Sequence, residues 1–503
     1  MSLTGSAFLL FFVILLCFYY MFPAKAQWIW LLLGSILFFI SAGGIKMVLY
    51  LVYGIVVAYT GARIIERSQG QKKRFWLLCL VVFLLISELV VLKYLFNLGN
   101  LMQSIFHFHK NIDMWNLAAP IGISYYTLSI MGYVFDVYYE SYAAEKNFLK
   151  FSLFTCYFPQ LVSGPVTKYA EMAPQMFQFH KLKGRELMHG VERMIIGYLK
   201  KCVIADQLGL FVQAVYHGDM PYSGSYLIAA TIAYAFQLYA DFSGCMDIVL
   251  GASQAFGITL PENFHSPFFS TTLSEFWRRW HITLGVWFKE YVFYPILKST
   301  FMQKIGKTCK KKFGKKKGKK IPTYLGLICI WLAIGLWHGG TAMYFLASGI
   351  IPGIYLIGSE IFQPFFKWII SVFHINTNCI SYTFFCRIRT VLLMCLCWIF
   401  VCAGSINGGI AVIKEIIGVF NPWILLDGSL LSIGWTSTMH FIMAFLGVIL
   451  IIYLDRLDYN GENFLVKLEG QNIGFQCVFW WTILFVIMYF GVFGQSSFIY
   501  FQF

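Results

Sequence analysis

The chain has 503 residues, of which 59% are hydrophobic and only 12% are charged. A soluble domain carries roughly 25% charged residues, so this sequence cannot cover a water-exposed surface, and a soluble globular protein is excluded. The formal net charge is +15, but eleven lysines lie within Lys298–Lys320, which leaves +4 for everything else. Because only Phe301 and Phe313 interleave with these lysines and no folded domain surrounds them, we do not expect nucleic-acid binding.

Apolar stretches of membrane-spanning size recur along the chain. A helix needs about 20 apolar residues to cross a bilayer, and the candidate stretches are Phe8–Phe22, Trp28–Ile40, Met47–Tyr59, Phe75–Phe96, Leu117–Tyr138, Gly190–Val212, Tyr226–Leu250, Ile321–Trp337, Thr341–Gly358, Thr390–Ala403, Phe441–Leu454 and Val478–Phe493. We therefore predict an all-α, polytopic membrane protein with roughly a dozen transmembrane or re-entrant helices. Since no internal repeat divides the sequence, we expect a single domain over residues 1–503.

The lysine-rich segment Lys298–Lys320 contains no acidic residue. It is too hydrated to cross a membrane easily, so the positive-inside rule predicts a cytoplasmic loop between two spans. A basic segment of this kind also suits contact with anionic lipid head groups.

No metal site is predicted. The thirteen cysteines are scattered mostly through apolar segments, which favours small buried hydrophobes over metal ligands or disulfides. His107 and His109 form an isolated His-x-His pair without further ligands at useful spacing, which favours a surface loop.

One apolar segment, Ile328–Ile350, carries a histidine, His338, between Trp337 and the pair Gly339-Gly340. An ionisable side chain at membrane depth costs about 2.5–3.5 kcal/mol on insertion scales, so it is usually retained for a use. The glycines permit close approach of another backbone or a ligand. A functional histidine and a core histidine bonded to a neighbouring helix are equally compatible with the position alone.

Two carboxylates fall inside or beside another apolar span, at Asp241 and Asp247. Both should face the bundle interior and bond to a partner such as an arginine, and a structural ion pair is favoured over catalysis. Upstream, Tyr157–Pro165 contains two prolines and a glycine, which predicts a break in helix geometry, either a re-entrant segment or a tight interfacial turn.

The densest group of polar and aromatic side chains lies within Pro261–Pro295, where Trp277, Arg278, Arg279, Trp280 and His281 follow one another. Ser274 as N-cap and Glu275 in the first turn predict a helix start. Arginines beside tryptophans suit phosphate or carboxylate groups, or cation–π stacking. An interfacial anchor belt would explain the arginines and tryptophans but not His281, so a functional site is favoured.

The C-terminal residues Phe498–Phe503 are aromatic up to the last position. Exposed tails are normally polar and disordered, so this tail is predicted to enter a hydrophobic slot or to anchor at the membrane interface.

Together these segments resemble the membrane-bound O-acyltransferase family, and within it the branch of bacterial polysaccharide O-acetylation proteins. The motifs that carry the resemblance run in order over nearly the whole chain: Tyr19-Tyr20, Lys93-Tyr94, PIGISYYTLSIMGYVFDVYYE, FPQLVSGPVTKYAE, YADFSGCMDIVLGASQAFGITLPENF, FWRRWHITLGVWFKEYVFYP, GLWHGG and FIYFQF. The long lysine-rich insert after Lys298, and Gly340 with Thr341 where relatives often carry Ala and Ser, depart from the family pattern.

The resemblance implies a curved helical shell around a tunnel. His338 matches the family's catalytic histidine and His281 its second histidine. Substrate or tunnel contacts are expected from Trp277, Arg278, Arg279, Trp280, Asp241, Trp337, Phe498 and Phe503. No bound cofactor or metal is implied.

The resemblance also suggests the reaction. In related teichoic acid D-alanylation systems, a small membrane peptide ends in a Phe-x-Tyr-x-x-Phe pattern thought to carry the acyl group, and Phe498, Tyr500 and Phe503 match that spacing. We expect transfer of an acetyl group from acetyl-CoA to Tyr500, with His338 as base. An extracytoplasmic SGNH-type acetyltransferase partner would then acetylate a polysaccharide. The alternatives are D-alanyl transfer to teichoic acid and a transporter that performs no acyl chemistry.

Overall fold

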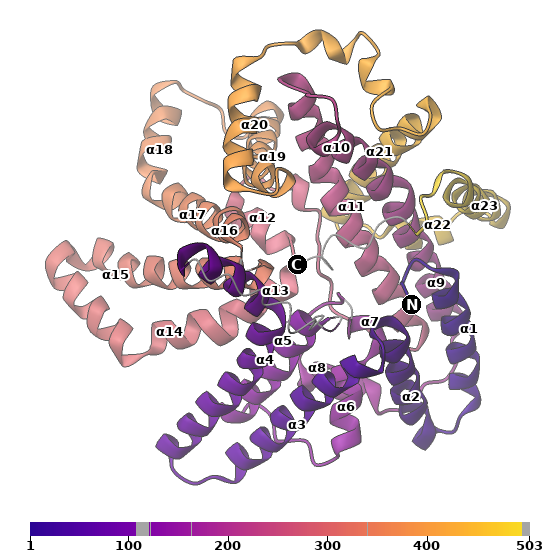
Figure 1. The fold of residues 1–503 in the computed structure, drawn as a ribbon, viewed down its shortest axis with the longest axis vertical. Helices are drawn as coiled ribbons and strands as arrows, with labels where there is room; N and C mark the ends of the chain where they lie inside the picture. The colour runs from indigo at the N-terminus through magenta and orange to yellow at the C-terminus, as the bar shows by residue number, and fades with distance from the viewer. Residues whose placement is uncertain (107–119, 121, 162, 340, 495–503) are drawn as a thin grey trace. The chain divides into compact units, whose positions relative to one another are not determined.

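The computed structural model describes residues 1–106, 120, 122–161, 163–339 and 341–494 of the chain. Within these residues the regular structure is helical, and one isolated antiparallel bridge joins Phe264 to Trp280 (Figure 1). The predicted all-α class is confirmed. The chain forms two compact units, and the expectation of a single domain stays a prediction.

Unit 1 comprises Met1–Lys201, Phe242–Glu262 and the residues from Val492 onward. Its helices are α1 (Ser6–Met21), α2 (Ala24–Gly43), α3 (Ile45–Arg67), α4 (Gln71–Phe106), α5 (Ile123–Tyr138), α6 (Phe148–Cys156), α7 (Phe158–Leu161), α8 (Tyr169–Met176), α9 (Gly184–Tyr198) and the last part of α11 (Ser225–Ala255). An aromatic cluster joins its helices, because Phe38 and Phe158 have ring centroids 5.8 Å apart, and Phe12 and Phe256 also 5.8 Å apart.

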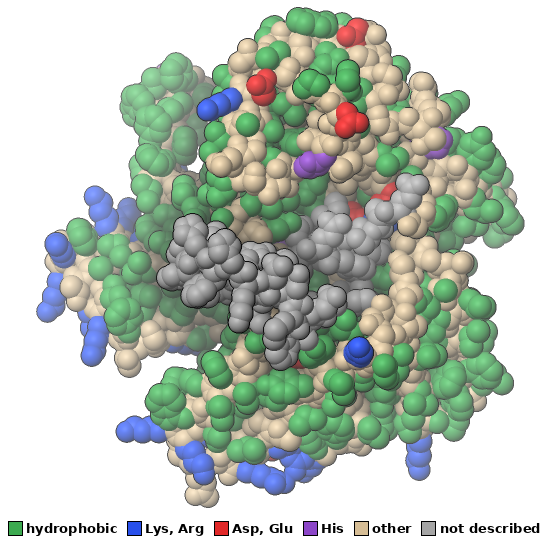
Figure 2. Space-filling model, viewed as in Figure 1, with side chains coloured by type: hydrophobic (Ala, Val, Ile, Leu, Met, Phe, Trp, Pro, Cys, Tyr) green, Lys and Arg blue, Asp and Glu red, His purple; other side chains and the backbone are tan. Residues whose placement is uncertain are grey.

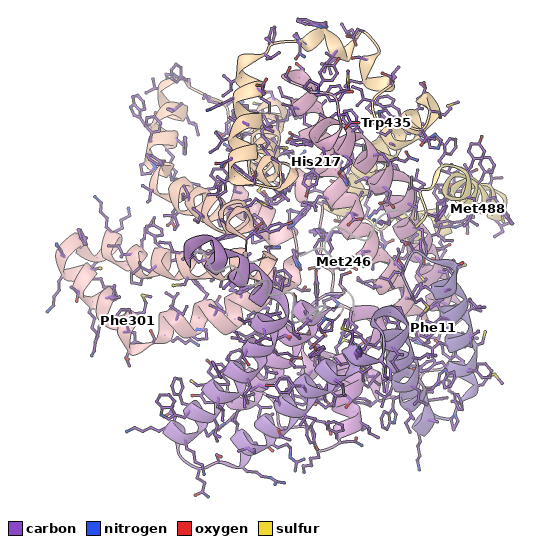
Figure 3. All side chains as sticks on the ribbon, viewed as in Figure 1. Phe11, His217, Met246, Phe301, Trp435 and Met488 are labelled. Carbon is purple, nitrogen blue, oxygen red and sulfur yellow. The ribbon has the colours of Figure 1, made fainter. Side chains whose placement is uncertain are left out.

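Unit 2 comprises Cys202–Asp241 and Asn263–Gly491. Its α-helices are α10 (Asp206–His217), the first part of α11, α12 (Leu273–Arg279), α13 (Ile282–Phe288), α14 (Tyr294–Lys298), α15 (Thr300–Gly339), α16 (Ala342–Phe345), α17 (Ile351–Ile361), α18 (Gln363–Val372), α19 (Ile380–Cys402), α20 (Ile406–Gly418), α21 (Thr438–Tyr459), α22 (Phe464–Glu469) and α23 (Ile473–Phe490). Trp435 (Figure 3) stacks on Phe211 of α10 with centroids 5.5 Å apart.

Eight helices in the described part of the chain are long and apolar enough to cross a membrane: Ala24–Gly43, Ile45–Arg67, Gln71–Lys93, Thr300–Gly339, Ala342–Ile361, Ile380–Cys402, Thr438–Tyr459 and Ile473–Phe490. Many of their side chains are apolar and exposed, such as Trp76 at 70% and Met488 at 78% (Figures 2 and 3). Such faces suit contact with lipid rather than water, because a soluble protein rarely exposes large contiguous apolar patches.

Four of the predicted spans, Phe8–Phe22, Leu117–Tyr138, Gly190–Val212 and Tyr226–Leu250, are not among these eight. Helix α1 is apolar but has only 16 residues, and helix α5 also has 16 residues in the described region. Helices α9 and α10 are separate segments joined by the π-helix Leu199–Ala205, and α9 carries charged residues. For α1, α5 and α9, length or charge explains this difference, and their expected crossing of the membrane stays a prediction.

The predicted helix break around Pro159 is confirmed. Helix α6 ends at Cys156, the four-residue helix α7 follows, and Ser163–Pro165 is not helical. Tyr157 and Phe158 are completely buried, so the break lies inside unit 1.

The lysine-rich segment, predicted as a cytoplasmic loop between two spans, is helical, and its cytoplasmic location stays a prediction. Helix α15 bends back at Gly314, whose φ of +78° is a left-handed conformation that glycine adopts without steric cost. The two legs pack closely, since a Cβ atom on Gly318 would lie 2.5 Å from the backbone of Cys309. Lysine favours helix formation, and packing against a second leg stabilises a helix that charge repulsion would otherwise weaken.

Candidate active site

A short backbone pairing positions His281 between α12 and α13. The amide of His265 donates to the carbonyl of Arg279 over 3.0 Å, and the amide of Ile282 donates to the carbonyl of Asn263, also over 3.0 Å. Helix α12 begins at Leu273 with Thr272 as its N-cap. This corrects the prediction of Ser274, which lies one residue inside the helix.

The imidazole of His281 is held in a defined orientation. Its backbone has φ +48°, which is uncommon for a residue other than glycine and is found at functional sites. The side chain is buried, and its Nδ1 lies 3.2 Å from Oδ1 of Asn263. Since an amide oxygen only accepts, Nδ1 carries the proton and Nε2 is the basic nitrogen of the neutral ring.

Asn263 is itself fixed by two further hydrogen bonds. Its Oδ1 accepts from the backbone amide of Thr283 over 3.1 Å and from the Thr283 hydroxyl over 3.0 Å. Both side chains are buried. Sequence reasoning missed Asn263 and Thr283, and the available signal was a polar amide within the dense Pro261–Pro295 segment.

His338 lies near the end of α15, and Trp337 connects it to His281. The rings of Trp337 and His338 have centroids 5.1 Å apart, and those of His281 and Trp337 are 6.0 Å apart. His338 is 9% exposed. Burial first, and then the nearby charge of His338, lower the pKa of His281 well below its usual range, so His281 is neutral at pH 7. The structure thus brings together the two histidines that the sequence singled out.

Glycine is required next to His338. A Cβ atom on Gly339 would lie 2.3 Å from the ring of Tyr344 in α16. The group that approaches Gly339 closely is a side-chain ring, not the backbone or ligand that was predicted, and Gly340 lies outside the described residues.

Trp277 lies within α12 and Trp280 directly follows its last residue, and the two side chains have different surroundings. Trp280 is buried in an aromatic cluster, stacked on Phe276 with centroids 5.4 Å apart and edge-on to Phe264 at 5.1 Å. Trp277 packs edge-on against Trp331 of α15 at 4.8 Å. Its indole N–H is buried without a hydrogen-bond partner among the described residues, which leaves a donor for a ligand.

The two arginines also differ. Arg279 pairs with Glu275 over 3.1 Å and lies over the ring of Tyr459 at 4.9 Å, so it has a structural role. Arg278 is exposed, and within the described residues it donates only to the hydroxyl of Ser274, over 3.3 Å. Of the pair, Arg278 is therefore the one whose guanidinium can reach an anionic substrate.

Asp241 and Asp247 are both largely buried, as predicted. Asp241 is 1% exposed. In unit 1, Asp247 accepts from Arg193 over 3.0 Å and from Lys200 over 2.7 Å, and Arg193 also binds Glu262 over 2.7 Å. The predicted ion pair with an arginine is confirmed for Asp247.

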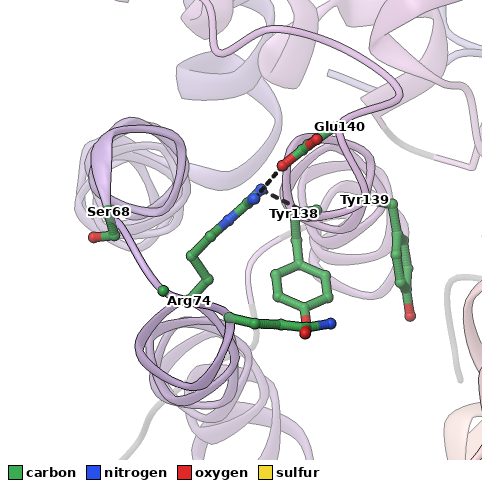
Figure 4. Close-up of a pocket in the computed structure, with 7 residues that line it drawn as sticks. Ser68, Arg74, Tyr138, Tyr139 and Glu140 are labelled. Carbon is green, nitrogen blue, oxygen red and sulfur yellow. Dashed lines mark hydrogen bonds and ion pairs between the residues drawn. The ribbon is translucent and has the colours of Figure 1, made fainter.

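A surface pocket in unit 1 is lined by Ser68, Gly70, Gln71, Arg74, Tyr138, Tyr139 and Glu140 (Figure 4). Arg74 forms an ion pair with Glu140 and donates to the carbonyl of Tyr138 over 2.9 Å. The lining contains no histidine or thiol, so this pocket lacks the base that acyl transfer requires.

Several predictions lie outside the described residues. These are the aromatic tail with Phe498, Tyr500 and Phe503, and the His107–His109 pair. The proposed role of the tail residues therefore rests on the sequence alone.

Comparison with known proteins gives consistent matches. The family model of the membrane-bound O-acyltransferase family matches residues 139–308. The peptidoglycan O-acetyltransferase of Helicobacter pylori is 30% identical over 435 residues, which cover 78% of this chain and 74% of that protein. The probable alginate O-acetylase of Pseudomonas syringae pv. tomato is 34% identical over 45% of this chain and 40% of its own. The teichoic acid D-alanyltransferase of Streptococcus thermophilus is 26% identical over 62% and 70%.

Proposed function

Since this chain belongs to the membrane-bound O-acyltransferase family, we propose that it moves an acetyl group from cytosolic acetyl-CoA towards a polysaccharide outside the membrane. The chain is an O-acyltransferase and a multi-pass membrane protein. The observation that carries the proposal is the buried pair of histidines, His281 and His338, arranged around Trp337.

In the proposed reaction His338 is the general base. It takes the proton from the acceptor hydroxyl while the hydroxyl oxygen attacks the thioester carbonyl carbon. The carbon–sulfur bond then breaks, and the sulfur of coenzyme A leaves with the proton that His338 returns. A positioned base contributes about 10²–10⁴-fold to such a step. Neutral His281, oriented by Asn263, places no positive charge beside His338 and so does not oppose the proton that His338 takes up.

The proposed acceptor is Tyr500 in the aromatic tail. A tyrosine hydroxyl has a pKa of about 10, so it needs a base to react near neutral pH. Phe498 and Phe503 would hold the tail by aromatic packing. The acetyl ester would pass to an extracytoplasmic SGNH-type acetyltransferase, and Trp277 and Arg278 would contact the donor.

Two substitutions test the proposal in order. His338→Ala should reduce polymer acetylation at least 100-fold while the protein inserts at normal levels, and undiminished acetylation would refute the base assignment.

Tyr500→Phe keeps the ring and removes only the oxygen. Intact-protein mass spectrometry after incubation with labelled acetyl-CoA should show one acetyl group on the wild type and none on Tyr500→Phe. If transfer persists in that variant, the acceptor is wrong but acyl transfer stands.

The second candidate is D-alanyl transfer to teichoic acid, which the relative from Streptococcus thermophilus favours by its name. The mass of the acyl group trapped on the protein distinguishes the two. Family membership weighs against a transporter without chemistry, in which Asp241 and His338 would relay protons. Consumption of the thioester by purified protein would decide between these.

A further inference from the structure

The lysine-rich hairpin formed by α14 and the first part of α15, here called the basic arm (residues 294–320), displays its charge outward. Of the eleven lysines in 298–320, all except Lys320 are exposed. Figure 2 shows blue side chains gathered at the outer end of α15. Lys320 pairs with Glu360 over 2.7 Å, and the described residues contain no other ion pair with these lysines. The arm's positive charge is therefore almost entirely uncompensated within the protein.

The two legs of the arm carry their lysines at the same end. A Cβ atom on Gly306 would lie 3.3 Å from Pro322, and one on Gly318 would lie 2.5 Å from Cys309, so the legs run antiparallel and in contact. The lysines between positions 307 and 312 on one leg therefore lie beside those between positions 315 and 320 on the other leg.

The returning leg continues directly into a membrane-length helix. Residues 321–339 are mostly apolar, and at 1.5 Å per residue they extend about 28 Å, which matches the ~30 Å hydrocarbon core. The lysines at 315–320 add about 9 Å beyond this. That reach spans the head-group region, which is about 5–7.5 Å deep on each side, so the continuity of α15 keeps the lysines at the membrane surface.

Exposed aromatic rings lie among the lysines. Phe301, labelled in Figure 3, is 70% exposed and Phe313 is 50% exposed. Rings interspersed with lysines suit the interface between head groups and acyl chains. A purely water-facing arm would gain nothing from them.

We propose that the basic arm binds the head groups of anionic phospholipids in the cytoplasmic leaflet. Lysines near such a surface are attracted to it, and the attraction is screened by salt over a Debye length. The rigid hairpin presents the charges together, so the arm loses little conformational freedom on binding. This role does not depend on the acyl-transfer chemistry proposed above.

The test compares two variants of the full-length protein, each with six substitutions. One changes Lys310, Lys311, Lys312, Lys315, Lys316 and Lys317 to Gln, and the other changes the same six to Arg. Native mass spectrometry from mixed micelles of phosphatidylglycerol and phosphatidylcholine counts retained lipids. We expect the wild type and the Arg variant to retain an excess of phosphatidylglycerol, and the Gln variant to lose at least half of it.

Two outcomes would overturn the proposal. One is an equal excess of phosphatidylglycerol on the Gln variant and the wild type. The other is a Gln variant that retains as much phosphatidylglycerol as the wild type but has a KM for acetyl-CoA raised more than tenfold. That result would mean that the lysines bind the phosphates of the donor. A measurement that requires no variant is the wild type at 0.05 M and 0.5 M NaCl, where the excess must fall as salt rises.

Discussion

The surroundings of His281 determine the orientation and protonation of its imidazole, which bear directly on the proposed chemistry. It is buried, has a left-handed backbone conformation and is held through Nδ1 by Asn263. A strained conformation that the surrounding structure maintains is typical of functional positions. The sequence predicted that this histidine matters, and the structure adds which nitrogen is basic.

The first prediction concerns pH. The pKa of His281 is lowered in the folded protein by burial and by His338, whereas the unfolded chain titrates near 6.5. The unfolded state therefore binds more protons as pH falls below about 6.5, and folding stability drops there. Wild-type protein should lose more thermal stability between pH 7 and pH 5 than His281→Asn.

The matched control is His374→Asn. His374 is exposed and has φ +50°, close to the +48° of His281, and asparagine tolerates this conformation. Melting curves of purified protein should show the wild-type pH dependence for His374→Asn. Equal pH dependence in all three proteins would contradict the buried, neutral His281.

The second prediction concerns Asn263 as a positioning residue. Asn263→Leu removes the acceptor of three hydrogen bonds, at a cost of about 1–3 kcal/mol per buried donor left unsatisfied. Transfer should fall about tenfold or more, because the imidazole loses the acceptor that fixes its orientation, and small misplacements at an active site can cost up to about 100-fold in rate.

Asn263→Asp separates positioning from packing. It keeps an acceptor oxygen but adds a negative charge that favours protonated His281, so the acidic limb of the pH–rate profile should move to higher pH. The control is Asn421→Asp, a buried asparagine of unit 2 that accepts from Ser225 instead, whose profile should not move. A profile unchanged in Asn263→Asp would exclude the positioning role.

At the scale of helices, glycine pairs determine how α9 packs on α11 within unit 1. A Cβ atom on Gly197 would lie 2.6 Å from the carbonyl of Gly244, and one on Gly190 would lie 2.7 Å from the carbonyl of Gly251. Small residues at such positions let backbones approach closely. The two pairs repeat at the same spacing on both helices, which specifies one register.

The third prediction follows from this crossing. Gly197→Ala should destabilise the protein by about 1–3 kcal/mol, because two of the nearest atoms, the carbonyl oxygen of Gly244 and the amide nitrogen of Ile248, belong to the backbone and cannot rotate away. Gly184→Ala, in the first turn of the same helix with open space around it, should be neutral or slightly stabilising. Thermal unfolding of the two variants gives the comparison, and equal effects would argue against the close crossing.

The fourth prediction concerns the ion cluster on the same pair of helices. Asp247 has a side chain that is 14% exposed and binds both Arg193 and Lys200. Asp247→Asn removes the carboxylate that both cations share, although Arg193 keeps its pair with Glu262, and breaking a buried pair costs about 3–5 kcal/mol. Glu186→Gln, which breaks the exposed pair with Lys183, should change stability by at most about 0.5 kcal/mol. The unfolding midpoints of both variants measure this difference.

At the scale of the whole molecule, the basic arm predicts membrane orientation. A protease site inserted after Gly314, at the bend of α15, should be cut in inverted vesicles and protected in intact cells, because basic segments stay cytoplasmic. The reverse pattern would place the arm outside and would exclude its contact with the cytoplasmic leaflet.

The limits of the sequence-based predictions follow from particular residues. All eight long apolar helices of the described residues could be anticipated, whereas the roles of His281 and His338 stay predictions. The N-cap of α12 was placed two residues late, at Ser274 instead of Thr272, because serine and threonine both cap helices. The basic segment was expected as a loop because charge suggested solvation, and its second leg was not visible in one dimension.

The sequence by itself determined that this is a helical membrane protein, because hydrophobicity is a local property that needs no knowledge of contacts. Its motifs indicated an acyltransferase through their resemblance to a known family. Only the tertiary structure decided that Asn263 orients His281, 18 residues away, and that Arg193 binds Asp247, 54 residues away. These pairings depend on how helices and turns bring distant residues together. Each pairing links polar groups whose burial would cost free energy if the hydrogen-bonding or charged partner were absent.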